Sequence, residues 1–160
     1  MRRRHLQLSF PGSVHFITLV TRVRGRWFCD EPVCTTLLRA FEHHRQRCHL
    51  DCRANVLMPD HVHALIIQTT NEGTVPSLVA EFKKWTSRNL RVANYPPTTL
   101  WRTWYDDVPV PGPDAIQTKI KYIHENPVRK GLVELPESYL WSSAPYYYGA
   151  GSGIVTIADY

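Results

Sequence analysis

Two largely apolar runs, separated by a short proline turn, most constrain how this chain folds. The first run extends from Cys52 to Met58, and the second, from His61 to Ile67, contains several β-branched residues, which favour strands. Pro59 and Asp60 stand between the runs, and both residue types are common in tight turns. We therefore predict a β-hairpin that enters a buried sheet.

The segments around this hairpin are predicted to alternate between strands and helices. The further elements that we predict are a strand over Val14–Val20, a helix over Asp30–His49, a helix over Ser77–Ala93, a strand over Leu100–Val110 and a helix over Asp114–Glu125. Pro127 is expected to stop the last helix, because proline has no amide hydrogen to donate. The order β-α-β-β-α-β-α predicts an α+β fold: a ferredoxin-like antiparallel sheet with helices on one face, plus an added C-terminal helix.

The composition is typical of a folded chain. Of the 160 residues, 43% are hydrophobic and 21% are charged, values that are typical of globular rather than disordered proteins. We expect a single domain over residues 1–160, with a basic arm over 1–10 and a loose tail over 149–160. No apolar run reaches the roughly 20 residues that span a bilayer, and the basic start lacks the apolar core of a signal peptide. A cytoplasmic location is therefore expected.

His61 and His63 are the most informative residues of the hairpin. Side chains two apart on a strand point to the same face, so the two imidazoles are expected to lie side by side, as two ligands of one divalent cation do. Burying them without partners would be costly, because each neutral ring carries both a donor and an acceptor. A pair of structural histidines is the alternative, and the spacing alone does not distinguish the two.

Tyr122 and Asn126 lie four residues apart in the last predicted helix, so they share one of its faces. A tyrosine hydroxyl, with a pKa of about 10, is a weak nucleophile at neutral pH unless its proton is removed or its target is activated. A divalent ion on the histidine pair would activate a phosphodiester in this way, and Asn126 offers an amide oxygen to the ion or to the phosphate. Two imidazoles and one oxygen favour Mg²⁺ or Mn²⁺ over a closed zinc site. The alternative for Tyr122 is a half-buried tyrosine with a solvated hydroxyl.

The positive charge of the chain is clustered. The net charge is +5, and the basic clusters are Arg2, Arg3 and Arg4; Arg22, Arg24 and Arg26; and Lys83, Lys84, Arg88 and Arg91. Such clusters mark either a phosphate-binding surface or a solvated basic face, and both interpretations stay open.

Four cysteines leave one more alternative. Cys48 and Cys52, together with His43, His44 or His49, would supply zinc ligands for a structural domain. Their spacing is wider than that of a zinc knuckle, so reduced thiols are the expectation.

Several motifs follow one another along the chain. They are His15-Phe16-Ile17-Thr18 with Thr21-Arg22, then Met58-Pro59-Asp60-His61-Val62-His63, then the run from Tyr122 to Val133, and finally Tyr139-Leu140-Trp141-Ser142-Ser143. With these motifs the chain resembles, over nearly its whole length, the REP-associated tyrosine transposases, which belong to the HUH single-tyrosine transposases of bacteria.

The resemblance implies a metal-dependent endonuclease and strand transferase that acts on single-stranded, hairpin-containing DNA through a covalent 5′-phosphotyrosine link. Carried onto this chain, it makes Tyr122 the nucleophile, His61 and His63 ligands of Mg²⁺ or Mn²⁺, and Asn126 a third ligand. It leaves open whether the protein acts as a monomer or as a homodimer. The residues that we expect to contact DNA phosphates are Arg2, Arg3 and Arg4 in the arm and Lys83, Lys84 and Arg88 on the second helix.

Two other functions stay open. A replication-initiator or relaxase-like nickase shares this chemistry, but it usually carries a helicase or other partner domain, for which 160 residues leave no room. A domesticated protein that binds DNA hairpins without cutting them has no need of His61, His63 and Tyr122 together.

Overall fold

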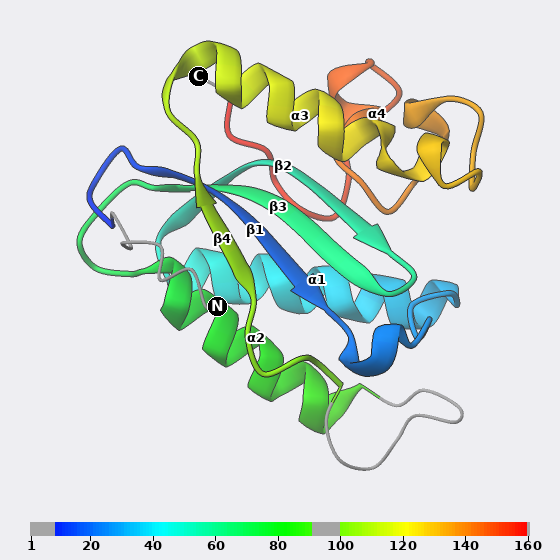
Figure 1. The fold of residues 1–160 in the computed structure, drawn as a ribbon, viewed down its shortest axis with the longest axis horizontal. Helices are drawn as coiled ribbons and strands as arrows, with labels where there is room; N and C mark the ends of the chain where they lie inside the picture. The colour runs from blue at the N-terminus through cyan, green and yellow to red at the C-terminus, as the bar shows by residue number, and fades with distance from the viewer. Residues whose placement is uncertain (1–8, 91–99, 160) are drawn as a thin grey trace.

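A four-stranded antiparallel sheet lies at the centre of the molecule, with strand order β2-β3-β1-β4 (Figure 1). The computed structural model describes residues 9–90 and 100–159. The strands are β1 (Val14–Val20), β2 (Leu50–Met58), β3 (His61–Gln68) and β4 (Asp106–Pro109), and the α-helices are α1 (Glu31–Arg47), α2 (Val75–Asn89), α3 (Gly112–Arg129) and α4 (Ala144–Tyr147). Short 3₁₀ turns η1 (Arg22–Arg24) and η2 (Pro136–Ser138) complete the chain. The predicted α+β class and element order are confirmed.

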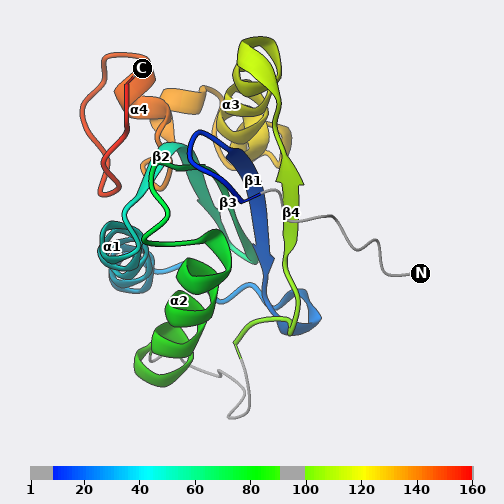
Figure 2. The same ribbon diagram turned by 90° about the vertical axis from the view of Figure 1, so that its left-hand side faces the viewer.

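The two faces of the sheet are covered by different helices. Figure 2 shows α1 and α2 on one side and α3 on the other. Ile17 and Leu19 of β1 pack with α1 and α2, whereas Phe16 of the same strand packs with Ile120 and Ile123 of α3. The strand alternation of period two therefore supplies both cores from one sheet. None of the helices in the described part of the chain is long and apolar enough to cross a membrane.

A β-bulge in β2 changes which of its side chains face α3. Cys52 pairs with Ile66 and Ala54 pairs with Leu65, so Arg53 is the extra residue of the bulged strand. Cys52 belongs to the core under α1 and α2, but Ala54, two residues later, belongs to the core under α3. In a regular strand, residues two apart would share a face. After the bulge, Ala54, Val56 and Met58 of β2 face α3 together with Leu65 of β3.

The tyrosine helix is longer than predicted. We expected it to stop before Pro127, but α3 continues to Arg129 with Pro127 buried inside it. A Schellman motif ends it: the amide of Leu132 donates to the Pro127 carbonyl at 2.9 Å, and Gly131, with φ of +71°, stands at the left-handed position. Packing of the buried helix face on the sheet outweighs the hydrogen bond that proline cannot donate.

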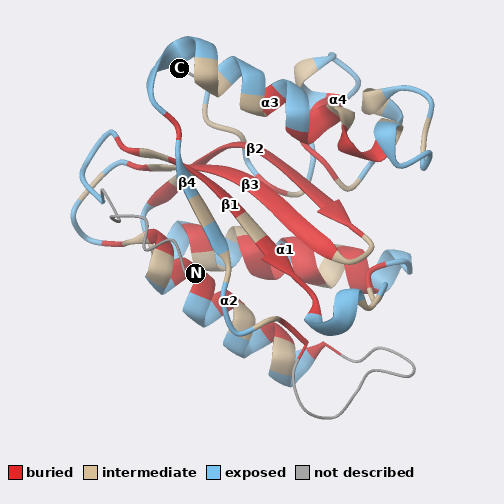
Figure 3. Ribbon diagram, in the orientation of Figure 1, coloured by how far each residue is buried: buried red, intermediate tan, exposed pale blue. Residues whose placement is uncertain are grey.

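The fourth strand is shorter than predicted. Of the expected span from Leu100 to Val110, only β4 pairs with β1, and Trp101 makes a single isolated bridge with Thr21. The Lys83 ammonium donates to the carbonyls of Arg102 and Trp104, at 2.8 and 3.3 Å. The carbonyls of Arg102 and Trp104 are therefore hydrogen-bonded to a side chain and not to a neighbouring strand. The result is a short, largely exposed edge strand beside the mostly buried β1 (Figure 3).

The C-terminal tail, which we expected to be loose, packs on the sheet. Val155 is 4% exposed and belongs to the core under α1 and α2. The amide of Ala158 donates to the Cys52 carbonyl at 2.9 Å, and the Arg53 guanidinium donates to the Ala158 carbonyl at 2.8 Å. The tail is therefore hydrogen-bonded to the bulge in β2, a contact that the glycine-rich composition of the tail does not indicate.

Candidate active site

His61 and His63 lie next to each other on the face of the sheet that carries α3. Both side chains are buried, and their ring centroids are 4.6 Å apart. Each stands opposite a partner that the antiparallel register fixes: Val20 faces His61 and Thr18 faces His63 on β1. The predicted juxtaposition of the two imidazoles is therefore present.

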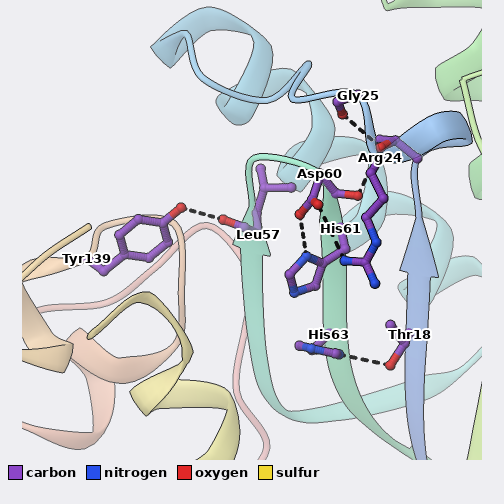
Figure 4. A network of polar contacts seen from close by, with 9 residues as sticks. Thr18, Arg24, Gly25, Leu57, Asp60, His61, His63 and Tyr139 are labelled. Carbon is purple, nitrogen blue, oxygen red and sulfur yellow. Dashed lines mark hydrogen bonds and ion pairs between the residues drawn. The ribbon is translucent and has the colours of Figure 1, made fainter. Parts of the chain in front are cut away.

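Each imidazole is oriented by a hydrogen bond at Nδ1 (Figure 4). His61 Nδ1 lies 2.6 Å from Asp60 Oδ1, and His63 Nδ1 lies 2.9 Å from Thr18 Oγ1. A carboxylate only accepts, so Nδ1 of His61 carries the proton and its Nε2 has a free lone pair. When the Thr18 hydroxyl accepts from His63, the same tautomer results. This arrangement, with the second nitrogen held by a neighbouring oxygen, is the one that metal-binding histidines use.

Burial keeps both imidazoles neutral. It lowers the pKa of His61 below its ordinary value, against the opposing effect of Asp60, and it lowers the pKa of His63 to about 3. Neighbouring cations, Lys119 and Arg129 among them, add to the effect on His63. Neutral imidazole is the form that binds a metal ion.

Tyr122 projects from α3 toward the same pair. Its ring is 41% exposed and stands 5.6 Å, centroid to centroid, from the His63 ring. Phe16 of β1 supports both rings from below, stacked on His63 at 5.0 Å and edge-on to Tyr122 at 5.8 Å. The structure therefore brings together an accessible phenol and a buried imidazole pair that come from different elements.

Two cations flank the tyrosine, and we did not single them out in the sequence. Lys119 Nζ lies 5.6 Å from the centre of the Tyr122 ring, and Arg129 Cζ lies 4.5 Å from it. Arg129 also donates to the backbone carbonyl of Tyr122 at 2.9 Å. Residues three positions before and seven positions after Tyr122 lie on the same helix face as Tyr122. Helical spacing would therefore have identified Lys119 and Arg129 in the sequence.

Asn126 lies one turn beyond Tyr122 and is 4% exposed. Its Oδ1 atom is buried and has no hydrogen-bond partner, although a buried amide oxygen normally has one. An unpaired oxygen on the helix that covers the histidine strand fits a third ligand for a hard divalent cation. Within residues 9–90 and 100–159, no three His, Cys, Asp or Glu side chains form a group able to hold a metal. The predicted ligand set contains two histidines and one amide, so it is not a group of that type.

The predicted DNA contacts lie elsewhere. Lys84 and Arg88 are exposed on α2, on the face of the sheet opposite Tyr122, and the Lys83 ammonium is engaged with two backbone carbonyls. Arg2, Arg3 and Arg4 fall outside the described residues. The structure does not bring the α2 cations to the tyrosine site, so their contact with DNA stays a prediction for a separate surface.

The cysteines provide no zinc site in the described part of the chain. Cys52 is fully buried and its thiol donates to the Ala54 carbonyl at 3.4 Å, while burial raises the pKa of the Cys52 thiol to about 12. Cys48 caps the end of α1. The structure does not assemble them with a histidine into the group of three that the zinc alternative requires.

Comparisons with known proteins agree with this fold. The family model described as "Transposase IS200 like" matches residues 10–126, most of the chain, which includes His61, His63, Tyr122 and Asn126. The structure is similar to that of a REP-associated tyrosine transposase bound to a REP hairpin, with a TM-score of 0.77 and 18% identity over 99% of this chain and 93% of that one. It is also similar to a proposed transposase from Deinococcus radiodurans R1, with a TM-score of 0.53 and 20% identity over 79% of this chain and 97% of that one.

At these identities the two solved structures show a shared fold. None of the curated proteins matches the sequence. The family assignment therefore depends on the sequence match over residues 10–126, which the motif order in the chain had predicted. The chain belongs to the IS200-like transposase family.

Proposed function

We propose that this transposase is a metal-dependent endonuclease and strand transferase for single-stranded DNA, with Tyr122 as its nucleophile. The observation that carries the proposal is the position of the exposed Tyr122 ring, 5.6 Å from the neutral His63 ring, which itself lies 4.6 Å from the His61 ring. A structural tyrosine would need no pair of oriented, desolvated imidazoles beside it. An unpaired Asn126 oxygen on the same helix adds support.

The residues present fit a divalent cation. His61 and His63 would bind it through Nε2, since Nδ1 of each is held by Asp60 or Thr18, and Asn126 would contribute Oδ1. Three neutral ligands suit Mg²⁺ or Mn²⁺ that keeps several waters. When bound, the ion supplies charge neutralisation and polarisation of the scissile phosphodiester.

The chain's own residues would perform the transfer. The Tyr122 oxygen attacks phosphorus, a P–O–Tyr bond forms, and the bond from phosphorus to the 3′-oxygen of the neighbouring nucleotide breaks. The phenolic proton passes through solvent to the departing 3′-oxygen, which leaves a 5′-phosphotyrosine link and a free 3′-hydroxyl. Lys119 and Arg129, on either side of the ring, are placed to neutralise the phosphate. Attack of a second strand's 3′-hydroxyl on the link reverses the step and rejoins DNA.

Hairpin-containing DNA is the substrate class that we propose. The relative with the same fold over 99% of this chain is a REP-associated tyrosine transposase bound to a REP hairpin. An exposed tyrosine on an open helix face requires a phosphodiester that is accessible from one side, which a single strand beside a hairpin offers. Whether one copy or two copies of the chain act together is a separate question that the proposal does not need.

Covalent trapping tests the proposal. Labelled single-stranded hairpin oligonucleotides from the DNA that flanks the gene would be incubated with the protein and either Mn²⁺ or EDTA, then run on a denaturing gel. We expect an SDS-resistant adduct with Mn²⁺ that EDTA and Tyr122→Phe each abolish. Tyr148→Phe is the matched control, because Tyr148 is also exposed, at 57%, but lies in the C-terminal region. Hairpin binding without any adduct across metals and flanking sequences would replace the proposal with a non-cleaving binder.

A further inference from the structure

A small basic pocket opens beside His61, and Tyr122 is not among the residues that line it. It has a volume of about 160 Å³ and is lined by the η1 loop, the β2–β3 turn and the end of α3, with Arg24, Arg26, Asp60, His61 and Lys130 among its residues. Three cations from two distant segments therefore meet at one edge of the candidate active site.

Two of these cations form no ion pair within the described residues. The Arg26 and Lys130 side chains are exposed, and no ion pair joins either of them to another residue in the described part of the chain. The single carboxylate of the pocket is already engaged: Asp60 Oδ1 holds His61 Nδ1 at 2.6 Å and Oδ2 lies 3.4 Å from Arg24 Nη1 (Figure 4). The pocket thus keeps a net positive charge that is available to an anion.

The loop that carries the arginines is held in an unfavourable backbone conformation. Val23 and Arg24 have φ of +54° and +55°, a left-handed conformation that is uncommon for residues other than glycine and is an outlier for a β-branched one. Val23 is also 81% exposed, so no burial of its side chain explains the conformation. Backbone strain of this kind persists where surrounding contacts enforce it and clusters at binding sites.

The surrounding contacts are specific. Thr21 Oγ1 donates to the Gly25 carbonyl at 2.7 Å and lies 3.1 Å from the Asp60 carbonyl, which ties the loop to the β2–β3 turn. A Cβ at Gly25 would lie 2.2 Å from the Trp27 indole, so a larger residue there would require the Trp27 side chain to shift. Arg24 and Arg26 are thereby held at the pocket before any ligand arrives.

We propose that Arg24, Arg26 and Lys130 form a binding subsite for a backbone phosphate of single-stranded DNA next to the scissile one. The proposal rests on the proposed function, since it assigns the path of the strand that Tyr122 would cut. Pockets for whole small-molecule ligands measure about 300–1,000 Å³, so a pocket of 160 Å³ takes a phosphate group and leaves the sugar and base outside. Its position beside His61 places that phosphate on the strand that passes the candidate metal ligands.

The salt dependence of binding tests the subsite without requiring cleavage. All variants would carry Tyr122→Phe, and the probe would be a fluorescein-labelled oligothymidylate of about 16 nucleotides, the upper end of typical single-strand sites. Each phosphate contact contributes about 0.7 to the slope of log affinity against log salt concentration for single strands. Because the subsite holds one phosphate, we expect Arg26→Gln and Lys130→Gln each to reduce the slope by up to that amount. Between about 50 and 200 mM salt, each would weaken the salt effect by up to about 2.6-fold.

Arg39→Gln is the matched control, because Arg39 is an exposed arginine on α1 at the other face of the sheet. Its slope should equal that of the parent. Unchanged slopes for both Arg26→Gln and Lys130→Gln, or no binding of the oligonucleotide by the parent, would overturn the subsite. Failure of the proposed function is a different result: the Tyr122 form would give no Mn²⁺-dependent adduct, whatever the slopes.

Discussion

The ring of Tyr122 stands at 66° to the imidazole of His63, with 5.6 Å between their centroids. The two residues come from α3 and β3, and the ring of Phe16 on β1 contacts both. Their distance therefore depends on how α3 packs on the sheet, whereas the His61–His63 spacing depends only on the geometry of one strand. Mutations can therefore alter the proposed metal ligands and the placement of Tyr122 separately.

Removing the Asp60 carboxylate should weaken metal binding. Asp60→Ala deletes the acceptor that fixes the His61 tautomer, and loss of such a partner typically costs 10–100-fold in metal affinity or activity. Titration of Mn²⁺ followed by electron paramagnetic resonance measures the affinity. Thr18→Val, which removes a neutral partner from His63, should have a smaller effect. Equal Mn²⁺ affinity in Asp60→Ala and the parent would contradict the assigned orientation.

Asn126→Leu should separate stability from metal binding. A buried polar group without a partner costs about 1–3 kcal/mol, so replacing Asn126 by leucine should leave the free energy of unfolding in EDTA unchanged or raise it by up to that amount. The same substitution should weaken Mn²⁺ binding, while Asn126→Asp should strengthen it by adding charge. Urea unfolding and Mn²⁺ titration measure the two quantities. A large loss of stability in EDTA would show that the Oδ1 atom has a structural partner.

Acid should destabilise the fold partly through His124. Burial lowers the pKa of His124 to about 4, and its Nε2 lies 2.8 Å from Ser143 Oγ. The unfolded chain, with an ordinary histidine pKa of about 6.5, binds the proton first. The stabilisation is therefore complete above pH of about 6.5 and is lost as pH falls toward 4.

Between pH 7 and pH 5 this single group should account for about 2 kcal/mol. Urea unfolding in EDTA at the two pH values measures the loss, and His124→Gln should reduce it by that amount. Identical pH dependence in parent and variant would mean that the pKa of His124 is the same in the folded and unfolded chains.

The C-terminal tail should contribute to stability. Val155 is buried at 4% exposure and its neighbour Thr156 is exposed. Val155→Ala should lower the free energy of unfolding by about 1–3 kcal/mol, and Thr156→Ala should change it by less than about 0.5 kcal/mol. Chemical denaturation of the two variants compares them directly. A tail that does not pack would give the same small effect at both positions.

The parts of the fold that depend on local patterns could be predicted from the sequence. The hairpin, the order of elements and the pairing of His61 with His63 all follow from turn residues and strand alternation within a few residues. The shared face of Tyr122 and Asn126 follows from helical spacing. None of these requires knowledge of distant contacts.

Features that depend on distant partners could not be predicted in this way. The path of α3 through Pro127 depends on its packing against β2 and β3, and the short β4 reflects carbonyls that Lys83 holds from another helix. The basic pocket joins Arg26 to Lys130, which are far apart in sequence. Each of these outcomes is set by tertiary contacts that outweigh local preference.

Arg53 has a consequence for how this family member can tolerate insertions and deletions. Because Arg53 is the extra residue of the bulge in β2, every side chain after it points to the side opposite from where a strand of the same length without a bulge would send it. Deleting Arg53 would make Cys52 and Ala54 consecutive residues of a regular strand, so Ala54, Val56 and Met58 would still face α3. Deleting a residue beyond the bulge, such as Asn55, would instead turn Val56 and Met58 away from α3 and remove part of the apolar surface on which the tyrosine helix packs. Such a change in chain length by one residue, far from Tyr122 in sequence, would displace Tyr122 without altering any residue of the candidate active site.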